Sequence, residues 1–231
     1  MKKAALFILA IVISTSICFA QNLNQTDAQG RKQGPWEKTY SNGAVRYKGQ
    51  FKDNHPYGTF KYFFPSGNVS AISVYTENGT VVHTKTFHLN GKPMAEGKFI
   101  NQKKDSTWNF YSDVDGKLVA KENYLNDLKN GKATVYYPSS EKTAEITYYK
   151  NGLKDGDWIK YFPDDSVYIH GYYKNDTLEG PYKVYDIYGH IQIEGNYMKG
   201  LQNGTWVTYD STGKVMYKQI FDRGALKKQI K

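Results

Sequence analysis

Residues 204–209 read Gly204-Thr205-Trp206-Val207-Thr208-Tyr209, and Gly213-Lys214 and Phe221 follow within the same unit. This pattern returns along the chain, most clearly in the aromatic residue that ends each unit. We call these residues, spaced by 24 or 25 positions, the ruler aromatics: Phe51, Tyr75, Phe99, Tyr124, Tyr149, Tyr173, Tyr197 and Phe221. A fixed period indicates one small structural unit copied in tandem, whose neighbours supply the core that a single copy lacks.

Two more aromatic columns lie inside the unit. All four tryptophans occupy one slot, at Trp36, Trp108, Trp158 and Trp206. A tyrosine column follows three residues later and includes Tyr111, Tyr136, Tyr161, Tyr185 and Tyr209. Most units also have a slot glycine two residues before the tryptophan position, with Val82 and Ser106 as the exceptions, and several have a turn glycine such as Gly43 or Gly213. Glycine accepts the positive φ that tight hairpin turns require.

The segments between the turns predict strands. They hold five to seven residues rich in Tyr, Phe, Val, Ile and Thr, which is too short for a helix. We therefore predict an all-β fold over residues 34–224: an elongated, twisted, antiparallel single-layer sheet of eight stacked β-hairpins, with about sixteen strands. Such a layer has little conventional core, so the recurring aromatic columns are expected to form its structural stack.

The two ends of the chain differ from the units. Residues 1–20 resemble a signal peptide, with Lys2 and Lys3, an apolar run, and small residues that favour cleavage after Ala20. An uncleaved anchor and a lipoprotein attached at Cys18, the only cysteine, are the alternatives. The compact leader looks bacterial and predicts a periplasmic, cell-surface or secreted protein. Residues 21–33 are predicted to be a disordered lead-in, and residues 225–231 a basic tail or frayed cap.

The charge is moderately basic. The formal net charge of +9 becomes +7 without Lys2 and Lys3, because 29 basic and 22 acidic residues then remain. The lysines are spread along the chain, which is typical of a solvated surface, and no nucleic-acid partner is expected. Attraction to anionic lipid or glycan stays open as an alternative.

No constellation in the sequence indicates catalysis. The five histidines fall in different columns, the mature chain has no cysteine, and no serine has an evident histidine partner. Asp113 with Asp115, and Asp164 with Asp165, lie in hairpin turns, where aspartate is favoured because it bonds its own backbone. We expect no enzyme, no metal site and no cofactor.

The column pattern resembles the MORN-repeat family, specifically its bacterial MORN-repeat-variant branch. Gly-x-Trp-x-x-Tyr followed by Gly-Lys is clearest at residues 204–214, and Gly156-Asp157-Trp158-Ile159-Lys160-Tyr161 repeats it. The third unit departs most, because Val82 and Thr84 replace Gly and Trp. The resemblance implies an extended hairpin sheet that acts as a recognition or scaffolding surface. Some relatives are described as antitoxins.

Three functions follow as hypotheses. The first is an exported, non-enzymatic surface for a protein partner; binding to an anionic membrane or glycan, and neutralisation of a secreted toxin, are the alternatives. Exposed edge strands also allow self-association of the sheet. Residues off the main columns are the better candidates for ligand contact: Tyr47, Tyr57, Tyr62, Tyr168 and Tyr188.

Overall fold

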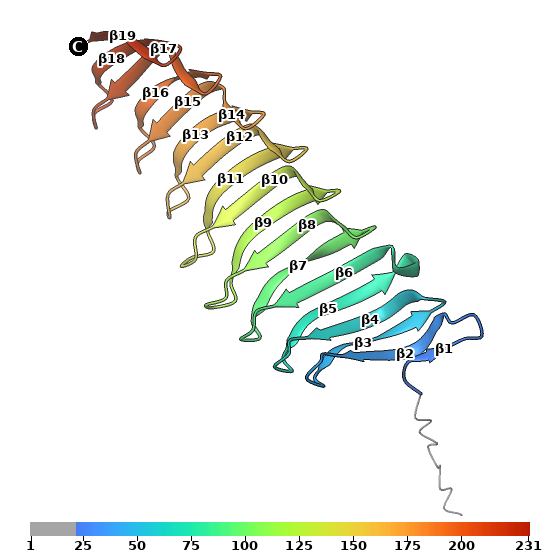
Figure 1. Cartoon of the computed structure of the whole chain (residues 1–231). Helices are drawn as coiled ribbons and strands as arrows, with labels where there is room; N and C mark the ends of the chain where they lie inside the picture. Colours follow the sequence, from blue (N-terminus) through green and yellow to red (C-terminus); the bar gives the residue numbers. More distant parts are fainter. Residues whose placement is uncertain (1–21) are drawn as a thin grey trace, which may run out of the picture.

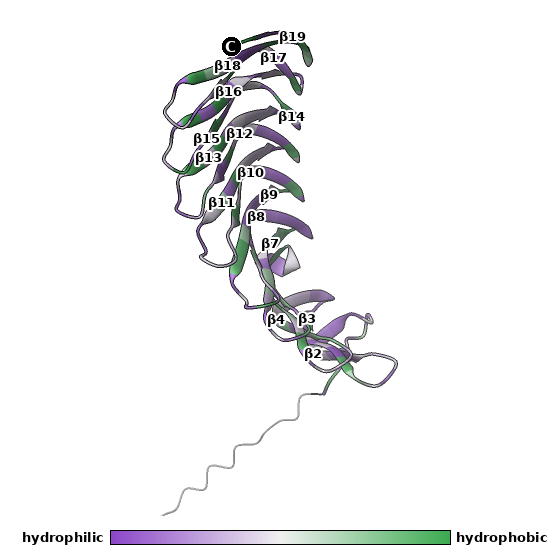
Figure 2. Cartoon of the chain, turned by 90° about the vertical axis from the view of Figure 1, so that its left-hand side faces the viewer, coloured by the Kyte–Doolittle hydropathy of each residue, from purple (hydrophilic) through white to green (hydrophobic). Residues whose placement is uncertain are grey.

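The computed structural model describes residues 22–231, which form one antiparallel β-sheet of 19 strands (Figure 1). Each strand pairs with its neighbours in the sequence, so the chain advances in one direction and its described ends lie at opposite ends of the sheet. The layer curves along its length (Figure 2). The predicted leader, residues 1–20, lies outside the described residues. No helix within residues 22–231 is long and apolar enough to cross a membrane.

The elements, in chain order, are β1 (Gln25–Thr26), β2 (Lys32–Thr39), β3 (Val45–Lys52), β4 (His55–Phe63), β5 (Val69–Thr76), η1 (Glu77–Gly79), β6 (Val81–Phe87), β7 (Pro93–Ile100), β8 (Lys103–Tyr111), β9 (Leu118–Leu125), β10 (Leu128–Tyr136), β11 (Thr143–Lys150), β12 (Leu153–Tyr161), β13 (Val167–Lys174), β14 (Thr177–Leu178), β15 (Gly180–Tyr185), β16 (Ile191–Met198), β17 (Leu201–Tyr209), β18 (Val215–Asp222) and β19 (Ala225–Ile230).

The predicted eight hairpins are confirmed, as is the all-β single-layer sheet. The hairpins run from β2–β3 to β17–β18, and the first strand of the seventh is split into β14 and β15. Sixteen strands were predicted; β1, β19 and this split account for the difference from 19. The repeat pattern therefore predicted the architecture, and the differences lie at the two ends and at one interruption.

Strand register places the aromatic columns on different faces. Each ruler aromatic pairs with the slot position of its unit, which holds glycine in six of the eight units, as in Gly34 with Phe51. The tryptophan, two residues after that glycine, lies on the same face as the ruler aromatic, because side chains alternate with a period of two. The tyrosine column comes three residues after the tryptophan and therefore lies on the opposite face. The expected single stack of all columns is thus divided between two faces.

We call the side of the sheet that carries the slot residues and ruler aromatics the aromatic face, and the side that carries the tyrosine column the ion-pair face. On the ion-pair face, the Lys48 Nζ lies 2.8 Å from Glu37 Oε2, and the Tyr209 hydroxyl donates to Glu194 Oε1 over 2.6 Å. All buried hydrophobic residues of residues 22–231 belong to the aromatic face: Phe60, Val82, Ala95, Trp108, Ala133, Ile169 and Trp206. The core of this sheet is therefore a line of side chains along one face.

Both long edges of the sheet join successive repeats. At the edge between repeats, the backbone N–H of Asp127 donates to the Lys104 carbonyl over 3.0 Å, and that of Asp176 donates to the Lys154 carbonyl over 2.9 Å. At the hairpin tips, the Tyr137 hydroxyl donates to a carbonyl of the next repeat over 2.6 Å. These bonds satisfy turn groups that an isolated hairpin would leave to water.

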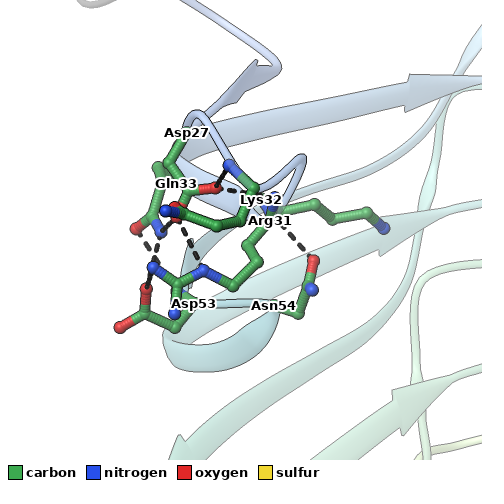
Figure 3. A network of polar contacts seen from close by, with 7 residues as sticks. Asp27, Arg31, Lys32, Gln33, Asp53 and Asn54 are labelled. Carbon is green, nitrogen blue, oxygen red and sulfur yellow. Dashed lines mark hydrogen bonds and ion pairs between the residues drawn. The ribbon is translucent and has the colours of Figure 1, made fainter.

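The N-terminal lead-in is ordered between residues 22 and 33, so the prediction of a disordered segment was wrong there. Asp27 accepts the backbone N–H of Arg31 and pairs with its guanidinium at 2.7 Å (Figure 3). The Gln33 amide donates to both Asp27 and Asp53, over 3.0 and 2.8 Å. Because Asp53 lies 20 residues away from Gln33, the sequence of residues 21–33 by itself gave no sign of this polar network.

The C-terminal segment also differs from a frayed tail. Residues 225–230 form β19, which pairs antiparallel with β18, and every residue of β19 is exposed. Lys227 and Lys228 therefore lie on the last strand of the sheet. Positive charge on an edge strand opposes pairing with a second sheet, because like charges repel.

Candidate ligand-binding site

Edge-to-face ring contacts run along the aromatic face. Phe51 contacts Trp36 and Phe60 with ring centroids 5.8 and 5.3 Å apart. At the other end, Trp206 contacts Tyr197 at 5.1 Å and Phe221 at 6.4 Å, again edge to face. This geometry brings the positive ring edge to the negative ring face. Slot rings and ruler aromatics thus pack against one another on this face, and their structural role stays a prediction.

Four glycines under the rings were missed in the sequence. Gly49, Gly97, Gly171 and Gly195 each stand two residues before a ruler aromatic, and the slot ring of the next repeat lies against their backbone. A Cβ on Gly97 would lie 2.3 Å from Trp108 Cδ2, and one on Gly49 would lie 2.3 Å from Phe60. Unlike the turn glycines, these four have no positive φ, so their role is close approach. Their shared spacing from the ruler aromatic was the available signal.

The row of slot rings is interrupted twice within the described repeats. Where Ser73 replaces the glycine, Thr84 replaces the ring of the following repeat, and the two hydroxyls bond to each other over 2.7 Å. Where Glu122 replaces the glycine, the following slot holds Ala133. There the Glu122 carboxylate binds the Lys129 ammonium at 2.6 Å and accepts the Tyr124 hydroxyl. At both interruptions, the slot ring and the glycine that would lie beneath it are both replaced by other residues.

A hollow of about 740 Å³ lies at the first interruption. The rings of Tyr62, Tyr75 and Phe99 line it, together with Ala71, Ser73 and Val82. Its rim carries the amide side chains of Asn78, Asn101 and Gln102, with His55 on one side. The size is within the range of small-molecule sites, which are mostly apolar with a few polar groups. The departure of the third unit, noted in the sequence, is therefore a hollow in the aromatic face.

A second column also changes at this hollow. In the first, fourth, fifth and sixth repeats, a lysine two residues before the slot position extends over the rings: Lys104 Nζ lies 4.6 Å from the Trp108 ring centroid, and Lys154 Nζ lies 4.8 Å from that of Tyr173. The seventh and eighth repeats have Leu178 and Gln202 at this position. In the second and third repeats, Pro56 and Thr80 take that position, and both line the hollow. The lining residues, all within residues 22–231, include no Lys, Arg, Asp or Glu. The site is apolar and uncharged next to a basic row.

Tyr62 is a half-buried tyrosine that lines the site. Its hydroxyl and that of Tyr75 are 2.8 Å apart and share a hydrogen bond. Burial, followed by this hydrogen bond and the nearby Tyr75 and Tyr47 rings, raises the pKa of Tyr62 well above its usual range. Tyr62 therefore stays protonated and neutral wherever the protein is folded near neutral pH.

We expect this raised pKa to make stability fall at alkaline pH. Above pH about 10, the usual tyrosine pKa, the unfolded chain loses the Tyr62 proton while the folded chain keeps it. Because the unfolded state then binds fewer protons, the free energy of unfolding decreases as pH rises. Urea unfolding measured from pH 8 upward should show this, and Tyr62→Phe should lessen the slope. A Tyr62→Phe curve that is only offset, with an unchanged slope, would contradict the assignment.

The five predicted ligand-contact tyrosines do not come together. Tyr62 lines the hollow. The Tyr47 ring packs against the Tyr62 ring, with centroids 5.9 Å apart, and also against the Phe60 ring. Tyr57 and Tyr168 lie at the surface, 42% and 39% exposed. Tyr188 is 82% exposed in a hairpin turn. The structure thus assigns Tyr62 to the candidate site, Tyr47 to its supporting stack, and the other three to separate places.

Titratable groups elsewhere have local partners. His170 Nε2 lies 2.9 Å from Asp157 and His190 Nδ1 lies 3.2 Å from Asp186. The hydrogen bonds that Ser166 gives to Asp164 hold the pKa of that carboxyl below its usual range, which suits a turn residue. Within residues 22–231, no three His, Cys, Asp or Glu side chains gather as metal ligands would.

The fold and site define a class: an open repeat protein whose hairpins form one continuous sheet. The model of the MORN repeat variant matches residues 154–175 and 202–223, which fall on β12–β13 and β17–β18. These two segments are therefore MORN-repeat-variant repeats, as the sequence columns predicted. MORN repeats are generally interaction repeats for proteins or membranes. No curated protein matches the sequence.

Proposed function

We propose that this protein is a non-enzymatic docking protein of the bacterial cell envelope, and that its aromatic face binds another protein. The hollow between Tyr75 and Phe99 carries this proposal, because it interrupts an otherwise regular surface with an uncharged, ring-lined site. Aromatic groups in a local depression are the usual anchors of protein interfaces. The family's general role in interactions supports the same reading. Toxin neutralisation would be one form of such docking.

The envelope location rests on the leader sequence. Lys2 and Lys3, the apolar run after them, and the small residues before Gln21 favour export and cleavage. Fractionation of the source bacterium, with N-terminal sequencing of the mature chain, tests this. We expect a chain that begins at Gln21 in the envelope fraction; a full-length chain in the cytoplasm would remove the location from the proposal.

Site-specific photo-crosslinking tests the docking. A photoreactive phenylalanine analogue replaces Thr80 at the rim of the hollow or, as a matched control, His83 on the ion-pair face. The two positions are close in sequence but lie on opposite faces. In living cells, we expect a defined envelope protein to be linked from position 80 and not from position 83. The same products from both positions, or none from position 80, would contradict docking on this face.

Binding to an anionic membrane or glycan is the second candidate. Lysines on the aromatic face favour it, since Lys32, Lys104 and Lys154 all extend over rings there, on a chain whose net charge is +7 without Lys2 and Lys3. Sedimentation with anionic phospholipid vesicles, or with an anionic polysaccharide, at low and high salt tests this reading. Electrostatic binding is strongest at low salt, so no binding there would exclude it.

A further inference from the structure

The hollow occupies the place of a missing side chain. In the second repeat, the Phe60 ring fills the slot between two ruler aromatics, with centroids 5.3 Å from Phe51 and 4.8 Å from Tyr75. In the third repeat, Val82 pairs with both Tyr75 and Phe99, and all three line the hollow. Thr84, two residues further along the strand, has no ring that could extend over Val82 between the two aromatic residues. We infer that the hollow binds an aromatic side chain of a partner protein, which completes the row of rings. This inference rests on the proposed docking function.

The walls suit an uncharged ring. The Tyr75 ring packs edge to face against Phe60, and the Phe99 ring packs in the same way against Trp108. Both rings also line the hollow, so an aromatic occupant would have the same kind of neighbours. The hydroxyl of Ser73, which lines the hollow, is already bonded to that of Thr84 on the next strand, so an apolar occupant leaves neither of them unpaired. At the rim, the amides of Asn101 and Gln102 can bond the peptide groups that flank a bound side chain.

The second interruption shows that a missing ring need not leave a hollow. Beside Ala133, the Glu122 carboxylate occupies the aromatic face and is held by Lys129 and Tyr124. The corresponding positions at the first interruption carry Ser73, Thr80 and Tyr75, which provide neither a carboxylate nor an ammonium group. The third repeat thus lacks both the ring and its charged replacement, and the apolar walls face solvent.

The glycine and ring pairs of the other repeats suggest a variant that tests this inference. The double substitution Ser73→Gly with Thr84→Trp restores the glycine-and-ring pair found at Gly97 and Trp108. The new ring would fill the hollow from within the chain. Ser73→Gly alone is the matched control, because it changes the same floor and leaves the hollow open. Circular dichroism and urea unfolding establish that both variants are folded before binding is measured.

The probe is N-acetyl-tryptophanamide, compared with N-acetyl-alaninamide and methyl glucoside. Backbone amide shifts of Ala71, Val82 and Phe99 report binding at the hollow in NMR titrations. We expect saturable shifts with the tryptophan compound only, with a Kd on the order of 1 mM, in keeping with a small ligand. Binding should persist in Ser73→Gly and weaken by about tenfold or more in the double variant.

Several outcomes would overturn the inference. These are no shifts at the hollow with the tryptophan compound, equal shifts in the double variant, or shifts with methyl glucoside alone, which would identify a carbohydrate site. The probe needs no natural partner, so this result is independent of the crosslinking test above. If position 80 links a partner and the probe fails, docking stands and the aromatic anchor falls. If the probe binds and no partner is linked, the hollow is a site for aromatic groups, but docking of a protein on this face is contradicted.

Discussion

Gly97→Ala is expected to lower the free energy of unfolding by about 3 kcal/mol, because it forces a methyl group into the Trp108 ring. The new Cβ would lie 2.3 Å from Cδ2, an atom at the centre of the indole that cannot swing aside like the end of a flexible chain. At an unstrained site, Gly→Ala adds about 0.4–1 kcal/mol by restricting the unfolded chain. At Gly97 the steric clash costs more than this gain, so the substitution lowers the free energy of unfolding instead of raising it. Urea unfolding of the two proteins measures the difference.

Gly171→Ala provides the matched control. At Gly171 the added Cβ would lie 3.1 Å from Tyr182 and 3.3 Å from Trp158, so a small shift of the rings relieves the contact. We expect a cost of about 1 kcal/mol or less there. Trp108→Ala in the Gly97→Ala background should also cost less than in the wild type, since the clash is gone. Equal costs for the two glycine variants would show that ring approach does not explain this column.

Trp108→Ala is expected to cost about 3–5 kcal/mol, the range for large aromatic truncations in a core. Trp108 is only 3% exposed, contacts Phe99 at 4.8 Å, and donates its indole N–H to the Lys98 carbonyl over 3.1 Å. Because each repeat contacts only its neighbours, the loss should remain local. Hydrogen exchange should show lost protection in β7–β9 and little change in β17 and β18.

Trp36→Ala is the control for this prediction. Trp36 occupies the same slot in the first repeat but is only half-buried, with Phe51 as its ring neighbour at 5.8 Å. We expect a smaller loss of stability and reduced protection confined to β2 and β3. A uniform loss of protection over the whole sheet in either variant would contradict nearest-neighbour coupling and indicate one cooperative unit.

Much of the candidate site was visible in the sequence, but not its geometry. Thr84 was recognised as a departure from the tryptophan slot, and Tyr62 was named as a contact candidate. Their relation was not visible, because it depends on Tyr75 and Phe99 standing on either side of Val82, next to the slot that Thr84 leaves without a ring. The link between Ser73 and Thr84 was equally hidden, since the glycine and the ring that exchange together belong to different repeats.

The errors at the ends have a common cause. The lead-in was judged by its turn-rich composition, whereas Asp27, Gln33 and Asp53 order it through contacts that join different strands. The last seven residues were judged by their lysines, whereas β19 forms because β18 offers an unpaired edge of N–H and C=O groups. Neither contact repeats with the unit, so period-based reasoning passed over both.

The ruler spacing from Phe51 to Phe221 was enough to establish the repeat, the hairpins and the all-β class, because a strand unit that cannot bury its own face must stack on its copies. Only the tertiary structure decided which columns share a face, why Gly97 must lack a side chain, and where the aromatic row stays open. These features depend on strand register and on rings that reach across to another repeat. Sequence spacing records neither of them, because both are distances in space.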